Sequence, residues 1–448
     1  MMKHTIRMAN TLFVALLVAT GTLPATATEN WPTWRGSDST GAALTTAPPT
    51  SWSETENVAW KVKLTGGGQS TPVVWGNKII ILQASSADER AEPTRRPDSA
   101  EQLRGTGRSS VVGKTQRPIN FNVTCLDRHT GNLLWERTAT TAIPHEGHHQ
   151  AGSFAPYSAV TDGELVFASF GSRGLYCFDL AGNPQWQQDL HPMTIKYGFG
   201  EGSSPALAGD VVVVVQDHEG PSKISAFNKH TGKVLWEVDR DEGTSWSTPV
   251  TVEVNGRYQV IVNGTNRIRS YDSVTGKVIW ECGGMTRNVI PTPVIGFGRV
   301  YCSSGFHGSI MKAIDLGHAG DLTDTDAVAW SYDQGTPYVS SALLAGDRIY
   351  QLEDIKPIFS CVDAKSGAIL YSGERLRGLK QVYASPVASA THVYVLDRNG
   401  NTAVIERGDT LKVVALNKLD DGFDASPVIV GNALYLKGNN YFYCIAAS

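Results

Sequence analysis

The stretch TPVTVEVNGRYQVIVNGTNRIRSYDSVTGKVIWE, residues 248–281, contains the pattern that decides the fold. It divides into four short runs rich in Val, Ile and Tyr, which favour β-strands. The runs cover residues 249–254, 258–262, 267–272 and 277–281, and Gly and Asn turns separate them. Runs this short and this rich in β-branched residues do not favour helices. The stretch therefore predicts four antiparallel strands joined by tight turns.

Two features of this stretch recur along the chain, which indicates an internal repeat. The first is a Ser or Thr followed by Pro or Ala at the start of a strand-forming run. It occurs eight times, at Thr71-Pro72, Ser158-Ala159, Ser204-Pro205, Thr248-Pro249, Thr292-Pro293, Ser341-Ala342, Ser385-Pro386 and Ser426-Pro427. From the third copy onward the copies are 41 to 49 residues apart, the length of one four-stranded blade of a β-propeller.

The second feature is a turn motif, Asp-x-x-Thr-Gly or a close variant, followed by an aromatic residue. Regular copies end at Trp135, Trp236, Trp280 and Tyr371, and less regular ones at Trp186 and Trp330. Thr-Gly favours a tight hairpin, and the aromatic residue is expected on the outer strand, where it can cover the neighbouring blade. We therefore predict an all-β fold, an eight-bladed β-propeller of four-stranded antiparallel blades.

Closure of the ring is expected to use the N-terminal side of the chain. The last repeat lacks an outer strand, whereas residues 57–64 form a strand-like run before the first repeat, with Trp60 in the aromatic position. Pairing this run with the last repeat would close the ring and remove exposed sheet edges. The propeller is then expected over residues 57–448, with residues 84–120 as a loop insertion in the first blade and residues 28–56 as an N-terminal extension.

The N-terminus has the pattern of a secretory signal peptide. Lys3 and Arg7 precede an apolar run at residues 11–23, and Ala25-Thr26-Ala27 resembles a cleavage site. We expect residues 1–27 to be removed and the protein to be exported, to the periplasm or outside the cell. No Cys stands at the cleavage site to mark a lipoprotein, and no stretch reaches the roughly 20 apolar residues of a transmembrane helix.

The net charge of the chain narrows the classes of partner that it could bind. The formal net charge is −4, which gives no electrostatic reason to bind nucleic acid or an anionic membrane.

Four of the six cysteines, Cys125, Cys177, Cys361 and Cys444, occupy the same position of different repeats. Equivalent strands of different blades are a place for packing, so we expect buried thiols and no disulfide framework.

The repeats resemble those of the pyrroloquinoline quinone (PQQ) repeat superfamily, whose units start with Ser-Pro and end in Ala-x-Asp-x-x-Thr-Gly-x-x-x-Trp. Residues 125–135 and 226–236 fit that pattern closely, and Trp31–Gly36 and Trp246–Pro249 look like segments of secreted bacterial PQQ-like propellers. The superfamily includes quinoprotein alcohol dehydrogenases and the outer-membrane assembly scaffold BamB. The resemblance thus implies the fold and leaves both an enzyme and a scaffold open.

Quinoprotein dehydrogenases differ from this chain in the residues that serve catalysis. They typically carry two adjacent cysteines over the cofactor, and the sequence has no Cys-Cys pair. Their calcium ligands and catalytic base cannot be matched here one by one. There is also no Cys-x-x-Cys-His motif for an attached haem.

Most long loops are expected on one face, because blades that begin at the inner strand place the inter-blade loops and the second-to-third strand loops together. These include residues 84–120, 140–157, 217–219, 306–307 and 353–354. Such a face is the expected place for binding.

Histidines in these loops suggest a metal site. His145-Glu146-Gly147-His148-His149 matches the zinc-protease pattern, but Pro144 and Gly147 argue against the helix that this chemistry needs. A loop site using His145, His148 or His149 with His218 or His307 is an alternative. The alternative interpretation is that these histidines are solvated or pack within their loops.

Residues just before each Ser/Thr-Pro pair are expected at the mouth of the axial channel. A flat cofactor such as PQQ would stack on Trp246 and pair its carboxylates with Arg287 or Lys380. The alternative is that these side chains cap strands and fill the channel. The set is Gln69, Tyr157, Glu201, Trp246, Arg287, Tyr338, Lys380 and Asp424.

The sequence favours an exported, non-catalytic, monomeric propeller that binds a protein, a glycan or a small molecule on its loop-rich face. A PQQ-dependent oxidoreductase, with calcium and a divergent site, is the first alternative. A metal-dependent enzyme using the histidine loops is the second.

Overall fold

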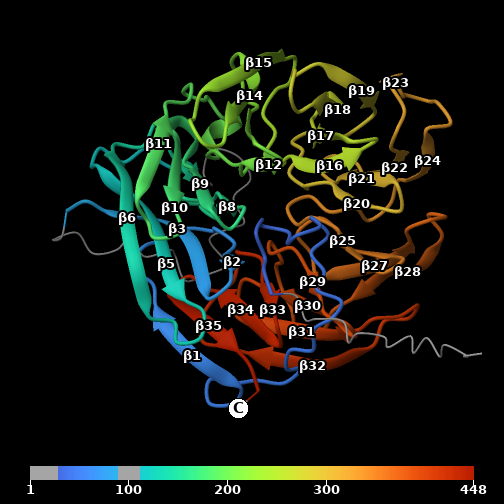
Figure 1. Cartoon of the computed structure of the whole chain (residues 1–448). Coiled ribbons are helices and arrows are strands. Elements are labelled where there is room, and N and C mark those ends of the chain that lie inside the picture. Colours follow the sequence, from blue (N-terminus) through green and yellow to red (C-terminus); the bar gives the residue numbers. More distant parts are fainter. Residues whose placement is uncertain (1–28, 89–110, 448) are drawn as a thin grey trace, which may run out of the picture.

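The computed structural model describes residues 29–88 and 111–447, and in this part of the chain eight four-stranded sheets surround one axis (Figure 1). The prediction of an all-β, eight-bladed propeller is confirmed. The predicted signal peptide, residues 1–27, lies outside the described residues. No helix in the described residues is long and apolar enough to cross a membrane.

Each blade runs from an inner strand at the axis to an outer strand at the rim. Blades 1 to 4 are β2 (Val73–Trp75), β3 (Lys78–Ser86), β5 (Ile119–Asp127) and β6 (Leu133–Ala142); β8 (Val160–Thr161), β9 (Leu165–Ser169), β10 (Leu175–Asp179) and β11 (Pro184–Gln188); β12 (Ala206–Ala208), β13 (Val211–Gln216), β14 (Ser222–Asn228) and β15 (Val234–Arg240); and β16 (Val250–Val254), β17 (Arg257–Val262), β18 (Arg267–Asp272) and β19 (Val278–Gly283). The four strands predicted within residues 248–281 are those of blade 4, with ends shifted by one or two residues.

The second half of the ring repeats this order. Blades 5 to 8 are β20 (Val294–Gly296), β21 (Arg299–Ser304), β22 (Ile310–Asp315) and β24 (Val328–Tyr332); β25 (Leu343–Ala345), β26 (Arg348–Leu352), β27 (Ile358–Asp363) and β28 (Ile369–Arg375); β29 (Val387–Ala388), β30 (His392–Leu396), β31 (Asn401–Glu406) and β32 (Val413–Lys418); and β33 (Val428–Val430), β34 (Ala433–Lys437), β35 (Tyr441–Ile445) and β1 (Val58–Lys63). A short strand, β23 (Gly320–Asp321), adds to β19 in parallel.

Blade 8 closes the ring with its outer strand taken from the N-terminal side of the chain. β1 pairs antiparallel with β35, with Lys61 opposite Tyr443. The Trp60 ring packs on Phe442 and Tyr435, with ring centroids 5.4 and 6.1 Å away. The expected closure is therefore confirmed, and blade 8 is built from both sides of the sequence.

The eight Ser/Thr residues of the first repeat feature form a continuous belt around the axis. The backbone N–H of each one donates to the side-chain hydroxyl of the equivalent residue in the next blade, at 2.8 to 3.2 Å. The Ser426 N–H donates to Thr71 Oγ1 and completes the circle. All eight residues are buried. The repeat thus requires a hydroxyl because each blade supplies one acceptor to its neighbour.

Most tryptophans of the second feature lie over the hairpin of the next blade, whereas the indole N–H of Trp280 donates to Gln259 Oε1 in its own blade. The indole N–H of Trp236, for example, donates to Ser273 O at 2.9 Å. The ring covers Gly276, where a Cβ would come within 2.7 Å of it. Trp60, Trp135, Trp186 and Trp330 make the same contact with a glycine in the blade that follows. Gly is needed here for its positive φ and for this close approach.

Apolar side chains between neighbouring blades form the core. One cluster joins Val73 and Phe121 of blade 1 to Val166 and Phe178 of blade 2. All six cysteines are buried and unbridged, as expected. Burial in apolar surroundings raises the pKa of Cys125 to about 12, so this thiol is unreactive.

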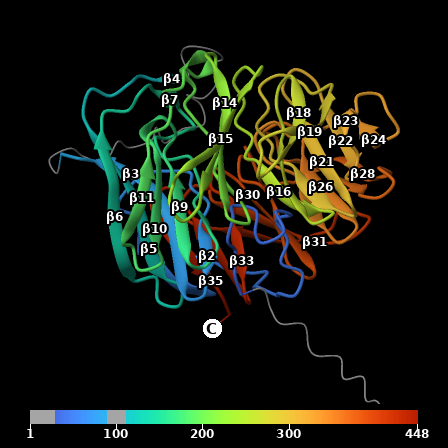
Figure 2. The same ribbon diagram turned by 45° about the horizontal axis from the view of Figure 1, so that its top comes forward.

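The two faces of the ring differ in their loops (Figure 2). Short turns between the first two strands and between the last two strands lie on one face, here called the short-turn face. The inter-blade loops and the loops between the second and third strands lie on the other, the loop-rich face. Of the insertion predicted at residues 84–120, the described parts lengthen β3 and β5 and form β4 (Val111–Val112), which pairs with β7 (His148–His149).

The N-terminal extension does more than cover the propeller, because it bonds directly to inner strands. Trp31 pairs with Val74 in β2, and Ala42 forms a parallel bridge with Ala388 in β29. Between them Arg35, which is 1% exposed, donates to the carbonyl oxygens of Ala342 and Pro386. The extension therefore holds inner strands on both sides of the closure.

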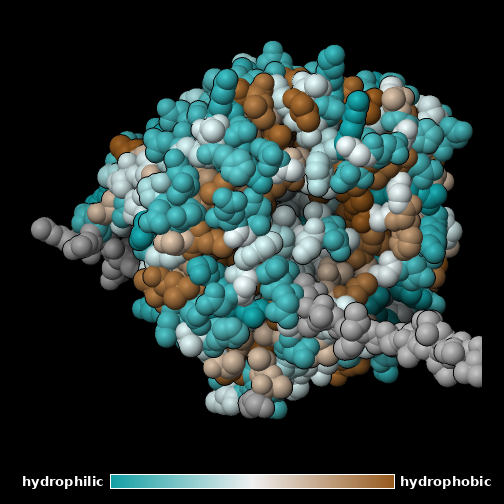
Figure 3. Space-filling model, in the orientation of Figure 1, coloured by the Kyte–Doolittle hydropathy of each residue, from teal (hydrophilic) through white to brown (hydrophobic). Residues whose placement is uncertain are grey.

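Figure 3 shows that the surface in the view of Figure 1 is mainly hydrophilic, with apolar side chains in scattered patches. Several exposed apolar residues belong to outer strands, among them Leu133, Val234, Val278 and Ile369.

Candidate functional site

Loops from blades 1 to 5 are tied together on the loop-rich face. The His149 N–H, in the loop between blades 1 and 2, donates to Phe199 O in the next inter-blade loop at 2.8 Å. The indole N–H of Trp246, one loop further, donates to Gly200 O at 2.8 Å, and its backbone N–H donates to Val289 O. Consecutive loops thus form one connected layer.

Within this layer a small pocket brings together two carboxylates. Its volume is about 30 Å³, and Glu146 and Glu201 both contribute to its lining, with His145, Tyr157 and Arg173 beside them. We call it the Glu146–Glu201 pocket. It lies where β5, the loop 143–157 and the loop after β9 meet.

Three hydrogen bonds fix the position of the Glu201 carboxylate. It accepts from the Tyr157 hydroxyl at 2.8 Å, from the Ser172 N–H at 2.8 Å and from the Ser172 hydroxyl. Burial, with the Glu201 charge beside it, raises the pKa of Tyr157 well above its usual value, so this phenol remains a donor.

Glu146 is in a different environment. Burial raises its pKa to about 7, and the nearby charge of Glu201 acts in the same direction. One backbone donor, the Ile195 N–H at 3.0 Å, partly offsets this effect. The pocket therefore places the hydrogen-bonded Glu201 carboxylate beside Glu146, whose pKa is raised to about 7, an arrangement that suits hydrogen bonding to a polar ligand.

The predicted mouth residues are only partly brought together. Tyr157 and Glu201 line the pocket, and Trp246 borders it through Gly200. Gln69 accepts from Ser153 and donates to Ala151 O. The other four stand in the loops before blades 5, 6, 7 and 8.

Those four residues have separate surroundings. Tyr338 stacks on Phe306, with ring centroids 4.7 Å apart. Asp424 forms an ion pair with Arg398 at 2.7 Å. Arg287 and Lys380 are exposed, in the loops before blades 5 and 7. Each of these four side chains is stacked, paired or exposed, so together they do not form a single binding site.

The candidate metal ligands are also distributed. His148 and His149 form β7, and His145 lines the Glu146–Glu201 pocket. His218 Nδ1 accepts from the Thr194 and Gly220 N–H groups, and its Nε2 faces Pro221 O. His307 lies against Phe306. Among residues 29–88 and 111–447 no group of three or more His, Cys, Asp or Glu is placed to hold a metal, and the metal site stays a prediction.

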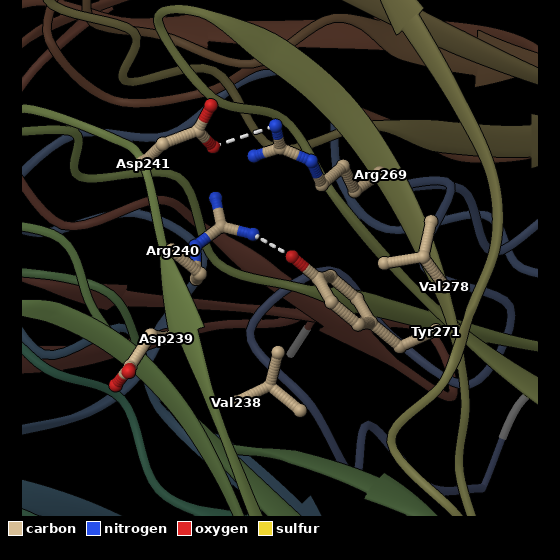
Figure 4. A pocket seen from close by; sticks show the side chains of 7 residues that line it. All are labelled: Val238, Asp239, Arg240, Asp241, Arg269, Tyr271 and Val278. Atoms are coloured by element: carbon tan, nitrogen blue, oxygen red, sulfur yellow. Dashed lines mark hydrogen bonds and ion pairs between the residues drawn. The ribbon is translucent and has the colours of Figure 1, made fainter.

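A larger cavity of about 420 Å³ lies between blades 3 and 4 (Figure 4). Arg240 at its base is fully buried, bonds both oxygens of Asp217 at 2.7 and 2.9 Å, and donates to the Tyr271 hydroxyl at 2.5 Å. Arg269 pairs with Asp241, Glu242 and Glu281. Because these charged side chains pair with one another, we interpret the cluster as a structural contact that joins the two blades.

A family model described as outer membrane protein assembly factor BamB matches residues 120–372, more than half of the chain. The chain belongs to this BamB family. Among solved structures, BamB from Moraxella catarrhalis is similar with a TM-score of 0.53 and 15% identity, covering 86% of this chain and 96% of its own. A europium-containing methanol dehydrogenase matches with a TM-score of 0.45 and 12% identity over 93% of this chain and 98% of its own. No curated protein matches the sequence.

The resemblance of the repeats to PQQ repeats raises the question of whether PQQ fits. The Glu146–Glu201 pocket has room for about one water molecule, and its two carboxylates would repel an anionic cofactor. Trp246 is fixed by its bond to Gly200 O, while the two expected cations, Arg287 and Lys380, stand on other loops. These residues do not fit PQQ, and we derive no step through it.

Some residues of the pocket were not expected from the sequence. Glu146 was noted only as part of the protease-like pattern, and Ser172 and Arg173 were not among the candidate site residues. No repeat marks them, because they belong to loops and a 3-10 turn (Gly171–Arg173) that vary between blades. Their roles depend on contacts between blades, which a single sequence does not reveal.

Proposed function

We propose that this protein is an exported, non-catalytic binding propeller whose ligand docks on the loop-rich face. The observation that carries the proposal is the connected loop layer. Hydrogen bonds join the successive inter-blade loops of blades 1 to 5, and the layer contains a polar pocket. A pre-formed surface of this kind is typical of binding sites on rigid scaffolds. Membership of the BamB family supports a scaffold role.

Charge reversal on each face tests the location of binding. The loop-face variant is Arg287→Glu with Lys380→Glu, and the matched control is Lys233→Glu with Lys277→Glu in exposed short turns. Biotinylated mature protein and both variants would be incubated with envelope and secreted extract of the producing cells, and the bound molecules identified. We expect the loop-face variant to lose molecules that the control retains. Equal retention by both variants would count against the proposal.

Enzymatic turnover is measured on the same protein. With PQQ and calcium added, we expect neither cofactor binding by absorbance nor dye-linked alcohol oxidation. Stoichiometric PQQ binding with turnover would replace this proposal with the oxidoreductase.

A further inference from the structure

An exposed tyrosine in a strained conformation stands on the loop-rich face. Tyr197 is 61% exposed, and its φ of 58° and ψ of 8° lie in the left-handed region. Non-glycine residues rarely adopt that region, because it brings Cβ too close to the following carbonyl oxygen. Such conformations persist where the surroundings fix them, and they concentrate at functional sites.

The loop on either side of Tyr197 is held by the two neighbouring inter-blade loops. The Ile195 N–H donates to Glu146 at 3.0 Å, and the Lys196 N–H donates to Thr244 Oγ1 at 3.1 Å. Phe199 O accepts from the His149 N–H at 2.8 Å. Ile195 is buried. The backbone around the ring is therefore fixed before any ligand arrives.

Tyr197 is one of a row of rings that leads toward the Glu146–Glu201 pocket. Its ring centroid is 5.4 Å from that of Phe199, which lies 5.1 Å from that of His149. Gly200, next to Phe199, lines the pocket. An aromatic surface thus adjoins a polar pocket on one continuous segment.

Charges of both signs surround this segment. Lys196 lies 5.9 Å from the Tyr197 ring and also lowers the pKa of Glu219 by its charge. Arg173 and Glu201 line the pocket together. Cations are thus paired or flanked by carboxylates here, and the two carboxylates of the pocket disfavour an anionic ligand.

We propose that Tyr197 is the stacking platform of a subsite for a neutral glycan, one hydroxyl group of which enters the Glu146–Glu201 pocket. A sugar ring has a face of C–H groups that packs on an aromatic ring and a rim of hydroxyls that bond to carboxylates. This inference rests on the proposed function, since it names the ligand class of the same loop layer.

The test separates the ring from the backbone strain. Tyr197→Asn removes the ring and keeps a residue that tolerates the left-handed region, while Tyr197→Trp keeps an aromatic face. The matched control is Phe297→Asn, since Phe297 is 49% exposed with a φ of 55° in the turn between β20 and β21, on the short-turn face. Calorimetry would measure binding of cellohexaose, maltohexaose and mannohexaose, with hexagalacturonate as the acidic comparison.

We expect at least one neutral hexasaccharide to bind. Tyr197→Asn should weaken it about tenfold or more without lowering the melting temperature, while Tyr197→Trp and Phe297→Asn retain binding. Binding only of hexagalacturonate, binding unchanged in Tyr197→Asn, or no binding would each overturn the glycan inference. If no glycan binds but the loop-face charge reversal still abolishes capture of a ligand, the proposed function stands and only this inference fails.

Discussion

At the residue scale, the repeat features are explained by contacts between neighbouring blades. Gly276 and Gly256 belong to the same blade and have nearly the same φ, 71° and 75°. A Cβ on Gly276 would lie 2.7 Å from the Trp236 ring, whereas nothing lies within 4 Å of one on Gly256. Only the first glycine therefore serves packing between blades.

This pair gives a test of the tryptophan contact. Both Gly276→Ala and Gly256→Ala add strain from a positive φ, of about 1 kcal/mol. Gly276→Ala should cost about 1–3 kcal/mol more, because it overpacks the Trp236 ring. Urea unfolding of both variants measures the difference, and equal losses would show that the contact contributes little.

The raised pKa of Glu146 predicts a pH effect on stability. A carboxyl with a higher pKa in the folded than in the unfolded protein binds its proton more tightly when folded. Stability should therefore fall as pH rises from about 4.5 to about 7, as Glu146 ionises beside Glu201. Glu146→Gln cannot ionise, so its melting temperature relative to wild type should be higher at pH 8 than at pH 5. A difference independent of pH would contradict the assignment.

At the element scale, the sequence revealed most of the strands and few of the site residues. The four runs of blade 4 were placed to within two residues, because each turn contains Gly or Asn and each strand has β-branched residues. The hydroxyl belt was visible only as a repeated Ser or Thr, since its bonds link residues in different blades. Tyr197 carried no signal at all, because the conformation that exposes it depends on contacts with two other inter-blade loops.

The belt makes a prediction about one of its links. Ser341→Ala removes the acceptor of the Thr292 N–H, which is buried and bonded at 2.9 Å. An unsatisfied buried N–H should cost about 1–3 kcal/mol. Ser341→Thr is the matched control, since Thr fills three of the eight belt positions, and it should retain most of the stability. Equal losses in the two variants would show that volume, and not the hydroxyl, matters there.

At the scale of the whole molecule, the chain closes on itself in two ways. β1 completes blade 8, and the extension holds inner strands of blades 1 and 7 across the same region. The extension therefore contacts inner strands on both sides of the blade that closes the ring.

Truncation separates the two contributions to closure. A mature chain starting at residue 65 lacks β1, which exposes the edge of β35 and should give aggregated or insoluble protein. A chain starting at residue 57 keeps β1 and loses only the extension, so it should remain soluble with a lower melting temperature. Size-exclusion chromatography compares them. A soluble monomer without β1 would contradict the closure.

Photo-cross-linking from both faces directly tests the proposal that the ligand binds on the loop-rich face. A photoreactive amino acid would replace exposed Arg287 in one protein and exposed Phe297 in the other, and both would be irradiated in the producing cells. We expect a discrete adduct from position 287 and none from position 297. An adduct from position 297 alone, or the same adduct from both, would contradict it.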